Sequence, residues 1–381
     1  MNFNLTDEQI LIQETARKFA KDHLEEGAIE RDEKKIWPED AVKKMSELGL
    51  MGIMVSPEYG GSGMDTISYT IAMEEICKSD ASVGVIMSVN NSLVCYLLEK
   101  YGSDKIKNKY LPELASGKKL GAFSLSEPQS GSDASNMKAI AERSGDYYIL
   151  NGTKNWVTNG IKSDYVIVFA VTEKDVGYKG VSCFLVDKDW EGFDVGKPED
   201  KLGIRSSDTC ELYFSDVKIP LENRIGSEGE GFKIAMSTLD GGRIGIASQA
   251  LGIAQAALEK SIAYAKDRKQ FGKPIAFNQA IQNKLAEMST SIESSRLLIR
   301  KAAWAKDKGE NYSQIAAQAK VFASETAVKA ATECVQIFGG NGYIREYGVE
   351  RLMRDAKITQ IYEGTSEIQK MVIGRNLLQN N

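Results

Sequence analysis

Apolar residues recur with two different spacings along this chain of 381 residues, and the spacing changes twice. A spacing of three to four, typical of helices, covers residues 1–118 and returns over 229–381, whereas residues 119–228 favour the spacing of two that is typical of strands. The chain is therefore predicted to be an α+β protein of three domains with these limits. They are an N-terminal helical domain, a middle antiparallel β-barrel and a C-terminal four-helix bundle.

The N-terminal domain is predicted to begin with a helix just after Thr6. Thr6 and Gln9 have the spacing of a capping box, in which each side chain satisfies a backbone N–H of the other residue. The positions predicted to share one face of this helix are Ile10, Leu11, Thr15 and Phe19. Further breaks between helices are predicted where Pro, Gly and Ser gather, at 37–38, 56–63 and 102–103.

The middle domain carries short apolar runs bounded by Gly, Asp, Asn and Ser, a pattern typical of strands. The clearest runs are 165–171, 181–186 and 210–217. Asn151-Gly152 lies between two further short runs, and this dipeptide favours the tight turn of a β-hairpin. Together the runs predict a small antiparallel barrel or sandwich.

The C-terminal domain shows two clear helical stripes. The first consists of Ala247, Leu251, Ala254, Leu258 and Ile262, and the second of Ile281, Leu285, Met288, Ile292 and Ile299. Breaks near 271–276, 308–312 and 339–348 predict four long helices, most simply arranged as a bundle. A ligand site is expected where the domains meet.

Composition and charge make several classes of function improbable. The formal net charge is −5 with both signs interspersed, so the sequence offers no basic patch for nucleic acid and no basic run for an anionic membrane. The sequence shows no run of about 18 apolar residues, so no membrane span is predicted. The five cysteines are scattered, which fits reduced thiols, and no signal or transit peptide precedes the first helix. A cytoplasmic protein is expected.

The chain has one histidine, His23, in the first predicted helix. A Ser-His-Asp triad or a His-ligated metal site is therefore poorly supported, and no metal is predicted. The nucleotide-binding motifs G-x-G-x-x-G after a strand and G-x-x-x-x-G-K-[ST] are also absent from the sequence. Proton chemistry would have to use carboxylates, tyrosines, lysines or a cofactor.

Five segments in order along the chain resemble the motifs of one family. They are 124–133 (SLSEPQSGSD), 156–160 (WVTNG), 268–273 (RKQFGK), 336–355 (QIFGGNGYIREYGVERLMRD) and 361–365 (IYEGT). The chain resembles the acyl-CoA dehydrogenases over essentially its whole length, and 84–93 and 240–255 are similar to the short-chain, butyryl-CoA branch. The resemblance implies FAD-dependent oxidation of a short-chain acyl-CoA to the trans-2-enoyl-CoA. Electrons would pass to an electron-transferring flavoprotein.

The resemblance assigns the catalytic base to Glu363. The α-proton of a thioester is too weakly acidic for a free carboxylate, so the base needs a pKa raised by desolvation and the carbonyl oxygen needs hydrogen-bond donors. The implied donors are the backbone N–H of Glu363 and a flavin hydroxyl. Tyr362 would wall the pocket, and Gly364 would leave room for the thioester. Relatives whose base comes from another helix carry Glu near position 242, which is Gly242 here.

The flavin is expected at the seam between barrel and bundle. The residues that the resemblance implies at its ring are Phe123, Leu125, Ser126, Trp156 and Thr158, and those at its pyrophosphate are Gly131 and Ser132. The Thr158 hydroxyl would lie near the flavin N5 and O4, where a hydrogen bond favours the negatively charged reduced form.

A second group would reach the FAD pyrophosphate and adenosine from a neighbouring subunit. Its members are Arg268, Phe271, Gln279, Gln336 and Gly340. Arg is a suitable phosphate partner, although an isolated Arg is more often part of a surface ion pair. Thr365 and Glu367 would lie by the adenosine. A monomer could then not complete the site, and the resemblance implies a homotetramer built as a dimer of dimers.

The acyl-CoA substrate would meet residues of both helical domains. Asp240 and Arg243 match family residues at the pantetheine and the active-site wall, with Ser132 as a further contact; by spacing alone they are equally a surface pair at i and i+3. Ile86, Val89 and Leu93 are spaced three and four apart on a predicted helix. They would line the base of the acyl pocket and limit chain length, or they would be plain core.

The sequence is compatible with three alternatives to a dehydrogenase. An enoyl-CoA reductase in a flavoprotein complex would use the same residues in the reverse direction. An acyl-CoA oxidase would usually be a much longer chain. A non-catalytic acyl-CoA-binding relative would be expected to have lost the base or a flavin contact, but Glu363, Thr158, Arg268 and Gly340 are all present.

Overall fold

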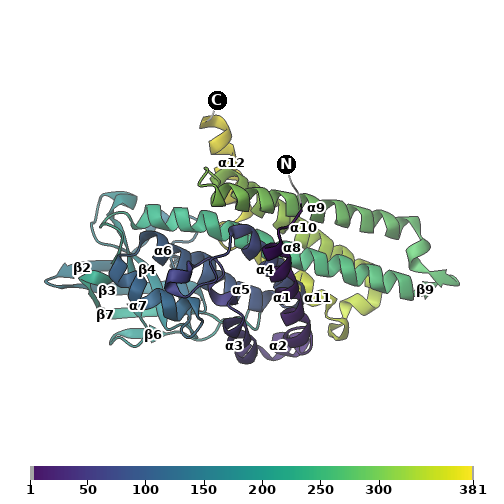
Figure 1. The fold of residues 1–381 in the computed structure, drawn as a ribbon, viewed down its shortest axis with the longest axis horizontal. Helices are drawn as coiled ribbons and strands as arrows, with labels where there is room; N and C mark the ends of the chain where they lie inside the picture. Colours follow the sequence, from purple (N-terminus) through teal and green to yellow (C-terminus); the bar gives the residue numbers. More distant parts are fainter. Residues whose placement is uncertain (1–3, 380–381) are drawn as a thin grey trace.

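The computed structural model describes residues 4–379, with helices in the first and last parts of the chain and strands between them (Figure 1). The N-terminal helices are α1 (Asp7–His23), α2 (Ala28–Lys34), α3 (Glu39–Glu47), α4 (Thr66–Ser79), α5 (Ala81–Ser88), α6 (Tyr96–Tyr101) and α7 (Asp104–Ala115). A π-helical segment, η3 (Val89–Cys95), joins α5 to α6 without a break. The predicted breaks at 37–38, 56–63 and 102–103 all fall between α-helices, although the second contains a short 3₁₀ turn at Pro57–Tyr59.

Helix α1 has the predicted capping box but a different buried face. The Thr6 hydroxyl accepts from the Gln9 N–H, and the Gln9 side chain accepts from the Thr6 N–H, both at 3.2 Å. Ile10 and Leu11, predicted to face the core, are instead 42% and 63% exposed. The apolar residues that α1 buries are Ile12, Ala16, Phe19 and Ala20. Phe19 is buried as predicted, but Ile10 and Leu11 are not, because three adjacent apolar residues, 10–12, fit two helical faces equally well.

One helical stretch, Ala81–Tyr101, is long and apolar enough to cross a membrane, with a mean hydropathy of 1.5. Within the fold 94% of the 18-residue apolar window in this stretch is buried, as in the core helix of a folded protein. Asn90 and Asn91 interrupt its apolar run, and their side chains donate to the backbone carbonyls of Met51 and Leu50, each at 2.9 Å. The stretch therefore serves as the centre of the N-terminal helices.

The middle of the chain forms one sheet of eight strands. They are β1 (Gly121–Ser124), β2 (Ile140–Ser144), β3 (Tyr147–Thr158), β4 (Tyr165–Val171), β5 (Val181–Asp187), β6 (Phe193–Val195), β7 (Thr209–Pro220) and β8 (Arg224–Ile225). Their order is β6-β7-β3-β2-β4-β5-β8, with β1 also paired to β4. β1 and β2 pair with β4 in parallel, so the sheet is mixed, and the antiparallel arrangement that was predicted holds for its other strand pairs. The chain reaches β4 from β1 through β2 and β3, a connection long enough for parallel pairing.

The sheet wraps around a core of its own. Tyr148 on β3 and Phe184 on β5 are in edge contact, with 4.9 Å between ring centroids, although β2 and β4 separate these strands in the sheet. Such a contact requires the sheet to fold over, as in a barrel or sandwich. No pairing joins β6 to β8 within residues 4–379, so the ring of backbone hydrogen bonds is open at that point.

Strand β4 explains why the middle domain reads as continuous apolar runs. Val166 and Val168 belong to the inner core of the sheet, whereas Ile167 and Phe169 belong to the core shared with the helices. A strand that is buried on both faces loses the alternation of apolar and polar residues. The sheet is thus held against the helices by its own apolar residues.

The hairpin predicted at Asn151-Gly152 was wrong. β3 runs straight through both residues, and its register with β7 shifts between Leu150 and Gly152, which marks a bulge. The Asn151 amide and the Asp216 carboxylate are hydrogen-bonded at 2.9 Å, which holds the irregularity. Gly152 has φ +145°, and a Cβ there would lie 2.7 Å from the backbone of Ala139. A β-bulge and a tight hairpin turn both favour Gly, because each can require a positive φ or a close approach of two backbones.

The C-terminal helices are α8 (Gly231–Asp267), α9 (Gln279–Asp307), α10 (Ser313–Phe338), α11 (Val349–Ile358) and α12 (Ser366–Gln379). Only the first three are long, so the prediction of four long helices was wrong in number; α4 from the N-terminal part packs beside α8 and α9. α8 runs from the sheet to the far end of the molecule, where β9 (Lys269–Gln270) and β10 (Lys273–Pro274) form a small hairpin (Figure 1).

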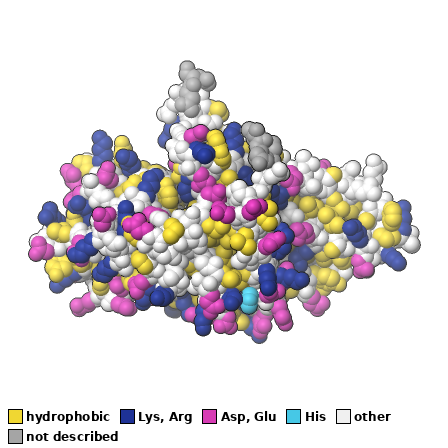
Figure 2. Space-filling model, viewed as in Figure 1, with side chains coloured by type: hydrophobic (Ala, Val, Ile, Leu, Met, Phe, Trp, Pro, Cys, Tyr) yellow, Lys and Arg dark blue, Asp and Glu magenta, His cyan; other side chains and the backbone are white. Residues whose placement is uncertain are grey.

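The two predicted stripes of the C-terminal helices face inward over most of their length. The exceptions are Ile262 in the first stripe and Ile281 and Leu285 in the second, which are only partly buried. The five cysteines are free and buried. Acidic and basic side chains are mixed over the face seen in Figure 2, in keeping with the pattern of the sequence.

Candidate active site

The loop that links α11 to α12 has an unusual backbone. Glu363 has φ +52° and the following Gly364 has φ +92°. The left-handed region is costly for a residue with a side chain, and such residues cluster at functional sites. Eight described residues other than glycine adopt it, and three of them are predicted site residues: Trp156, Phe271 and Glu363.

The Glu363 carboxylate lies against α8 at a glycine. A Cβ built on Gly242 would lie only 2.0 Å from Glu363 Oε2 and 2.8 Å from Leu93 Cδ2. The carboxylate therefore occupies the space that a side chain at position 242 would need. A carboxylate in this position and a side chain at 242 exclude each other, which gives a steric reason for the Gly242 seen in the sequence.

We predict that Gly242→Ala lowers activity far more than stability. The atom that the new methyl group meets first is the far end of the Glu363 side chain, which can move without disturbing the backbone. The displaced carboxylate would no longer face the substrate, and a misplacement of about 1 Å can cost roughly a hundredfold in rate. Steady-state kinetics and a thermal melt check this. A variant with normal kcat, or one with an equally severe loss of melting temperature, would contradict it.

The electrostatic surroundings of Glu363 suit a general base. Its Oε2 is buried and has no hydrogen-bond partner within residues 4–379. Burial raises the pKa of this carboxyl group to about 7, and the positive charges of Lys320 and Arg243 oppose the rise. A carboxylate with a pKa near neutral pH is a stronger base than an ordinary one and is still ionised in part.

Tyr362 is fixed by a chain of hydrogen bonds to two helices. Its hydroxyl donates to Gln249 Oε1 on α8, and the Gln249 Nε2 donates to the Ala81 carbonyl of α5 at 2.8 Å. Burial raises the pKa of Tyr362 well above its ordinary value, so the phenol stays neutral. The ring next to the base is thus held in one position.

Asp240 and Arg243 form the ion pair that their spacing allows, but they are not a simple surface pair. Arg243 is buried, and its Nε has no partner among the described residues. Asp240 also accepts from the Ser313 hydroxyl at 2.9 Å. Because Arg243 follows Gly242 directly and lowers the pKa of Glu363, this pair belongs to the surroundings of the base.

The predicted acyl-pocket residues Ile86, Val89 and Leu93 are all buried in the helix formed by α5 and η3. Leu93 and the Glu363 carboxylate both lie beside Gly242, since a Cβ on that glycine would come close to each of them. The π-helical geometry of η3 is rare and frequently marks functional sites. The floor beside the base is therefore apolar.

The residues predicted around the flavin ring lie at the ends of two strands. Phe123 is on β1, and Leu125 and Ser126 come just after the end of that strand. The Asn155 N–H of β3 donates to the Ser126 carbonyl at 2.8 Å, which brings the neighbouring Trp156 close to Ser126. Thr158 is the last residue of β3. Trp156 is 62% exposed on a left-handed backbone, an unusual position for a large aromatic ring with no ligand to cover it.

The loop that follows these residues has room for a ligand. Gly131 and Ser132 are exposed, and a Cβ built on Gly131 would meet no atom within 4 Å. Open backbone of this kind allows a phosphate group to approach its N–H donors. The exposed indole, the partly buried Thr158 hydroxyl and this open loop fit a flavin dinucleotide.

A buried ion pair that the sequence analysis did not single out braces the same loop. Lys154 on β3 is fully buried, and its Nζ donates to Glu127 Oε1 at 2.8 Å and to the Leu125 carbonyl at 3.1 Å. Glu127 also accepts from the backbone N–H groups of Lys138 and Ala139, at 2.6 and 3.0 Å. The strand ends that carry the ring residues are thereby tied together.

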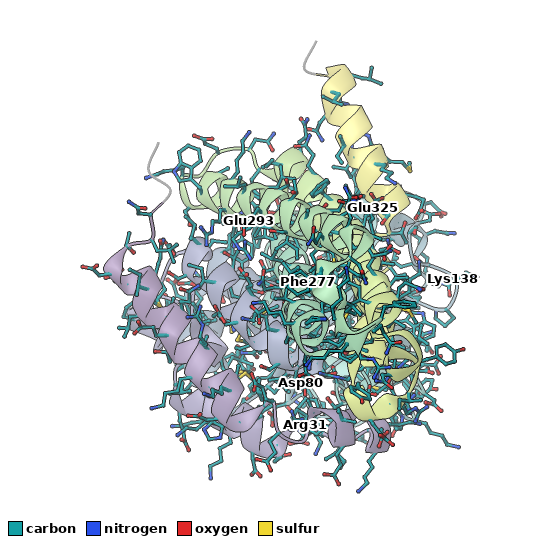
Figure 3. The ribbon with its side chains drawn as sticks, turned by 90° about the vertical axis from the view of Figure 1, so that its right-hand side faces the viewer. Arg31, Asp80, Lys138, Phe277, Glu293 and Glu325 are labelled. Carbon is teal, nitrogen blue, oxygen red and sulfur yellow. The ribbon has the colours of Figure 1, made fainter. Side chains whose placement is uncertain are left out.

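The second predicted group lies elsewhere. Arg268, Phe271, Gln279, Gln336 and Gly340 are all exposed at the hairpin end of the long helices. Gly242 on α8 and Arg268, the residue directly after this helix, are 26 residues apart, which corresponds to about 39 Å of helix. Phe271 is 98% exposed, and Phe277, near the centre of the view onto this end in Figure 3, is 66% exposed. This group therefore does not meet Glu363 within one chain.

Thr365 and Glu367 lie within four residues of Glu363 and are therefore not part of the group at the hairpin end of the long helices. The Thr365 hydroxyl accepts from the Ile368 N–H at 3.3 Å at the start of α12, and Glu367 is exposed. Within residues 4–379 no group of three or more His, Cys, Asp or Glu side chains could hold a metal ion.

Two further residues at the loop were not predicted. The Lys320 Nζ donates to the Gly364 carbonyl at 2.7 Å, and the Gln369 Nε2 donates to the carbonyls of Glu363 and Gly364, each at 3.0 Å. Both side chains are buried. Lys320 lies on the alanine-rich buried face of α10, and a lysine on a core stripe is the signal that could have identified it.

Comparisons with known proteins agree over the whole chain. Family models described as the N-terminal, middle and C-terminal domains of acyl-CoA dehydrogenase match residues 6–118, 122–217 and 229–378. The chain is 48% identical to "acyl-CoA dehydrogenase, short-chain specific" of Clostridium acetobutylicum over 379 residues, which covers 100% of both chains.

Two solved structures have nearly the same fold. The butyryl-CoA dehydrogenase of Megasphaera elsdenii has a TM-score of 0.98 and 49% identity, over 99% of this chain and 100% of that one. A chain from a structure described as the electron transferring flavoprotein of Acidaminococcus fermentans, in work on flavin-based electron bifurcation, has a TM-score of 0.98 and 48% identity. That match covers 100% of both chains.

Proposed function

The chain belongs to the acyl-CoA dehydrogenase family, and we propose that its substrates are short-chain acyl-CoA thioesters of the butyryl-CoA type. It is an FAD-dependent oxidoreductase that acts on a CH–CH bond next to a thioester carbonyl. The observation that carries this function is the buried Glu363 carboxylate, which has no hydrogen-bond partner in the described chain and faces the apolar floor made by Leu93 and Gly242.

FAD, when bound, supplies the hydride acceptor for the β-carbon of the acyl group. The residues proposed to hold its ring and pyrophosphate are Phe123, Leu125, Ser126, Trp156, Thr158, Gly131 and Ser132. Asp240, Arg243, Tyr362, Gly364 and Ser132 are proposed to contact the acyl-CoA.

Glu363 is proposed to remove the α-proton. Its low-dielectric surroundings favour the neutral acid that proton transfer creates, because burial penalises the carboxylate. The backbone N–H of Glu363 makes no hydrogen bond within residues 4–379, so this donor is available to the thioester oxygen. A donor aimed at a developing oxyanion typically contributes about 10²–10³ in rate.

We predict that flavin reduction by butyryl-CoA becomes faster as pH rises through about 7. Only the ionised Glu363 can accept the proton, and its pKa is about 7, so the ionised fraction grows with pH across that value. Anaerobic stopped-flow bleaching of the flavin over a pH series checks this. A rate that is flat with pH, or that falls as pH rises, would argue against Glu363 as the base.

The short acyl chain is proposed from the buried apolar side chains of Ile86, Val89 and Leu93, of which Leu93 lies beside Gly242, and from the short-chain names of the relatives. Anaerobic bleaching with straight acyl-CoAs of increasing length and with a branched thioester tests it. Fastest reduction by butyryl-CoA supports the proposal. Faster reduction by a longer or branched thioester would leave the chemistry intact and overturn the assignment of chain length.

The second group of residues supports an oligomeric enzyme. We propose a homotetramer, a dimer of dimers, in which Arg268, Phe271, Gln279, Gln336 and Gly340 of one subunit complete the FAD site of another, with Thr365 and Glu367 by the adenosine. About 39 Å of helix α8 separates this group from Gly242, and so from Glu363 of the same chain. Light scattering of the flavin-loaded protein gives the subunit number. A monomer with a full content of tightly bound FAD would overturn this arrangement.

An electron-transferring flavoprotein is the proposed electron acceptor. The similarity to a chain from a structure concerned with such a flavoprotein also favours one second candidate, enoyl-CoA reduction in a flavoprotein complex. Comparison of butyryl-CoA oxidation with crotonyl-CoA reduction, each with a purified electron-transferring flavoprotein, separates the two. Inactivity with that flavoprotein in both directions would exclude it as the partner.

A further inference from the structure

The catalytic loop is held from behind by a lysine that the sequence motifs do not include. Lys320 is fully buried on α10, with Ala316, Ala319 and Ala323 around it on the same helix face. Its Nζ donates to the Gly364 carbonyl at 2.7 Å. Gln369 donates to the same carbonyl and to that of Glu363. The two consecutive carbonyls of the left-handed turn are thus both occupied, which stabilises a backbone that is otherwise strained.

Lys320 has no carboxylate partner at ion-pair distance anywhere in residues 4–379. A buried ammonium group without an opposite charge is costly. The carboxylate that acts most strongly on it is that of Glu363; Glu367 acts on it more weakly. Burial lowers the pKa of Lys320 to about 7, and Glu363 opposes the fall.

The other groups that face Glu363 leave Lys320 with a distinct role. Arg243 on α8 is the second cation, but it is already paired with Asp240. Tyr69 on α4 and the adjacent Tyr362 are kept neutral by burial, which raises the pKa of both phenols. Among residues 4–379, Lys320 is therefore the cation near Glu363 that has no carboxylate at ion-pair distance and on which Glu363 acts more strongly than Glu367 does.

We propose that Lys320 is a positioning residue that holds the turn at Gly364 and supplies the positive charge that favours the ionised form of the Glu363 carboxylate. This inference rests on the proposed role of Glu363 as the base. It assigns to one side chain two separable actions, a hydrogen bond to the loop and a charge near the carboxylate.

Three substitutions separate the two actions. Lys320→Gln keeps a hydrogen-bond donor without the charge, Lys320→Met removes both, and Lys320→Arg keeps the charge. Lys329→Met is the matched control, because it removes a lysine from the exposed side of the same helix, where solvent screens the charge. The pKa of Glu363 is measured directly by difference infrared titration of its carboxyl band, with Glu363→Gln as the blank. The pH profile of flavin bleaching by butyryl-CoA gives the kinetic counterpart.

We expect the Gln and Met variants to raise the pKa of Glu363 by about one to two units, as for two charges several ångströms apart at an effective dielectric constant near 20. Lys329→Met should leave it near the wild-type value, and Lys320→Arg, whose guanidinium stays charged throughout the titration, should not raise it. Lys320→Met should also lose roughly tenfold or more in bleaching rate at high pH, where the carboxylate is ionised, because the turn has lost a donor.

An unchanged pKa of Glu363 in both the Gln and Met variants would overturn the inference, even if both melt at a lower temperature. If Lys320→Met does not fold, Lys320→Gln still decides the question of charge. If the proposed role of Glu363 as the base is wrong, a different measurement shows it. In that case Glu363→Gln would bleach as fast as the wild type, whatever the Lys320 variants do.

Discussion

Glu363→Gln is expected to abolish flavin reduction by butyryl-CoA, with a loss of about 10⁴-fold, near the upper end of what a general base contributes. Gln has nearly the shape of Glu, so it should fill the space beside Gly242 without a new clash. It cannot accept the α-proton, and among residues 4–379 no other carboxylate acts on this position: the charged groups that act on Glu363 are Lys320 and Arg243. Anaerobic stopped-flow absorbance gives the rate.

The control for this variant is its capacity to bind. Glu363→Gln should retain the FAD content and visible spectrum of the wild type, and butyryl-CoA should still perturb that spectrum without bleaching it. The loss then reflects the base and not the pocket. Bleaching within tenfold of the wild-type rate would show that another group takes the proton.

Lys154→Met is expected to destabilise the protein by about 3–5 kcal/mol, because it leaves the buried Glu127 without its counter-ion. The Glu127 carboxylate would keep its two backbone donors but lose the charge that offsets its burial. The Leu125 carbonyl would also lose a donor, so weaker FAD binding should accompany the loss of stability. Denaturant unfolding and the FAD content after gel filtration measure the two effects.

Lys138→Met is the matched control for this pair. The Lys138 side chain is exposed, and only its backbone N–H bonds to Glu127, so the substitution removes a nearby lysine but keeps that hydrogen bond. It should change the free energy of unfolding by less than about 0.5 kcal/mol. The double variant Glu127→Gln with Lys154→Met should lose less free energy of unfolding than the two single variants lose when their losses are added. A Lys154→Met variant as stable as the control would mean that the pair is not structurally important.

Residue spacing predicted the order of the elements but not all of their geometry. The capping box at Thr6 was predicted because it is local, whereas the buried face of the same helix depends on what packs against it, so Ile10 and Leu11 were misplaced. Asn151-Gly152 was taken for a hairpin because a bulge and a turn use the same residues. The parallel partners of β4 come from distant parts of the chain, which local spacing does not encode.

The same division holds for the site. Glu363 and Gly242 were singled out by family motifs, and the fold supplies the reason why they occur together. Lys320, Gln369 and Gln249 were missed because they act through backbone carbonyls and hydroxyls that only the fold brings near them. The family roles of the flavin and subunit residues, and the limits of the three domains, remain predictions.

The most direct test of the account is an anaerobic titration of the purified protein with butyryl-CoA, followed by its visible spectrum and by analysis of the thioester product. The account predicts a yellow protein whose flavin absorption bleaches as one trans-2-enoyl-CoA forms for each flavin reduced. A protein that stays colourless after FAD is supplied, or one that binds FAD but is bleached by no acyl-CoA, would contradict it.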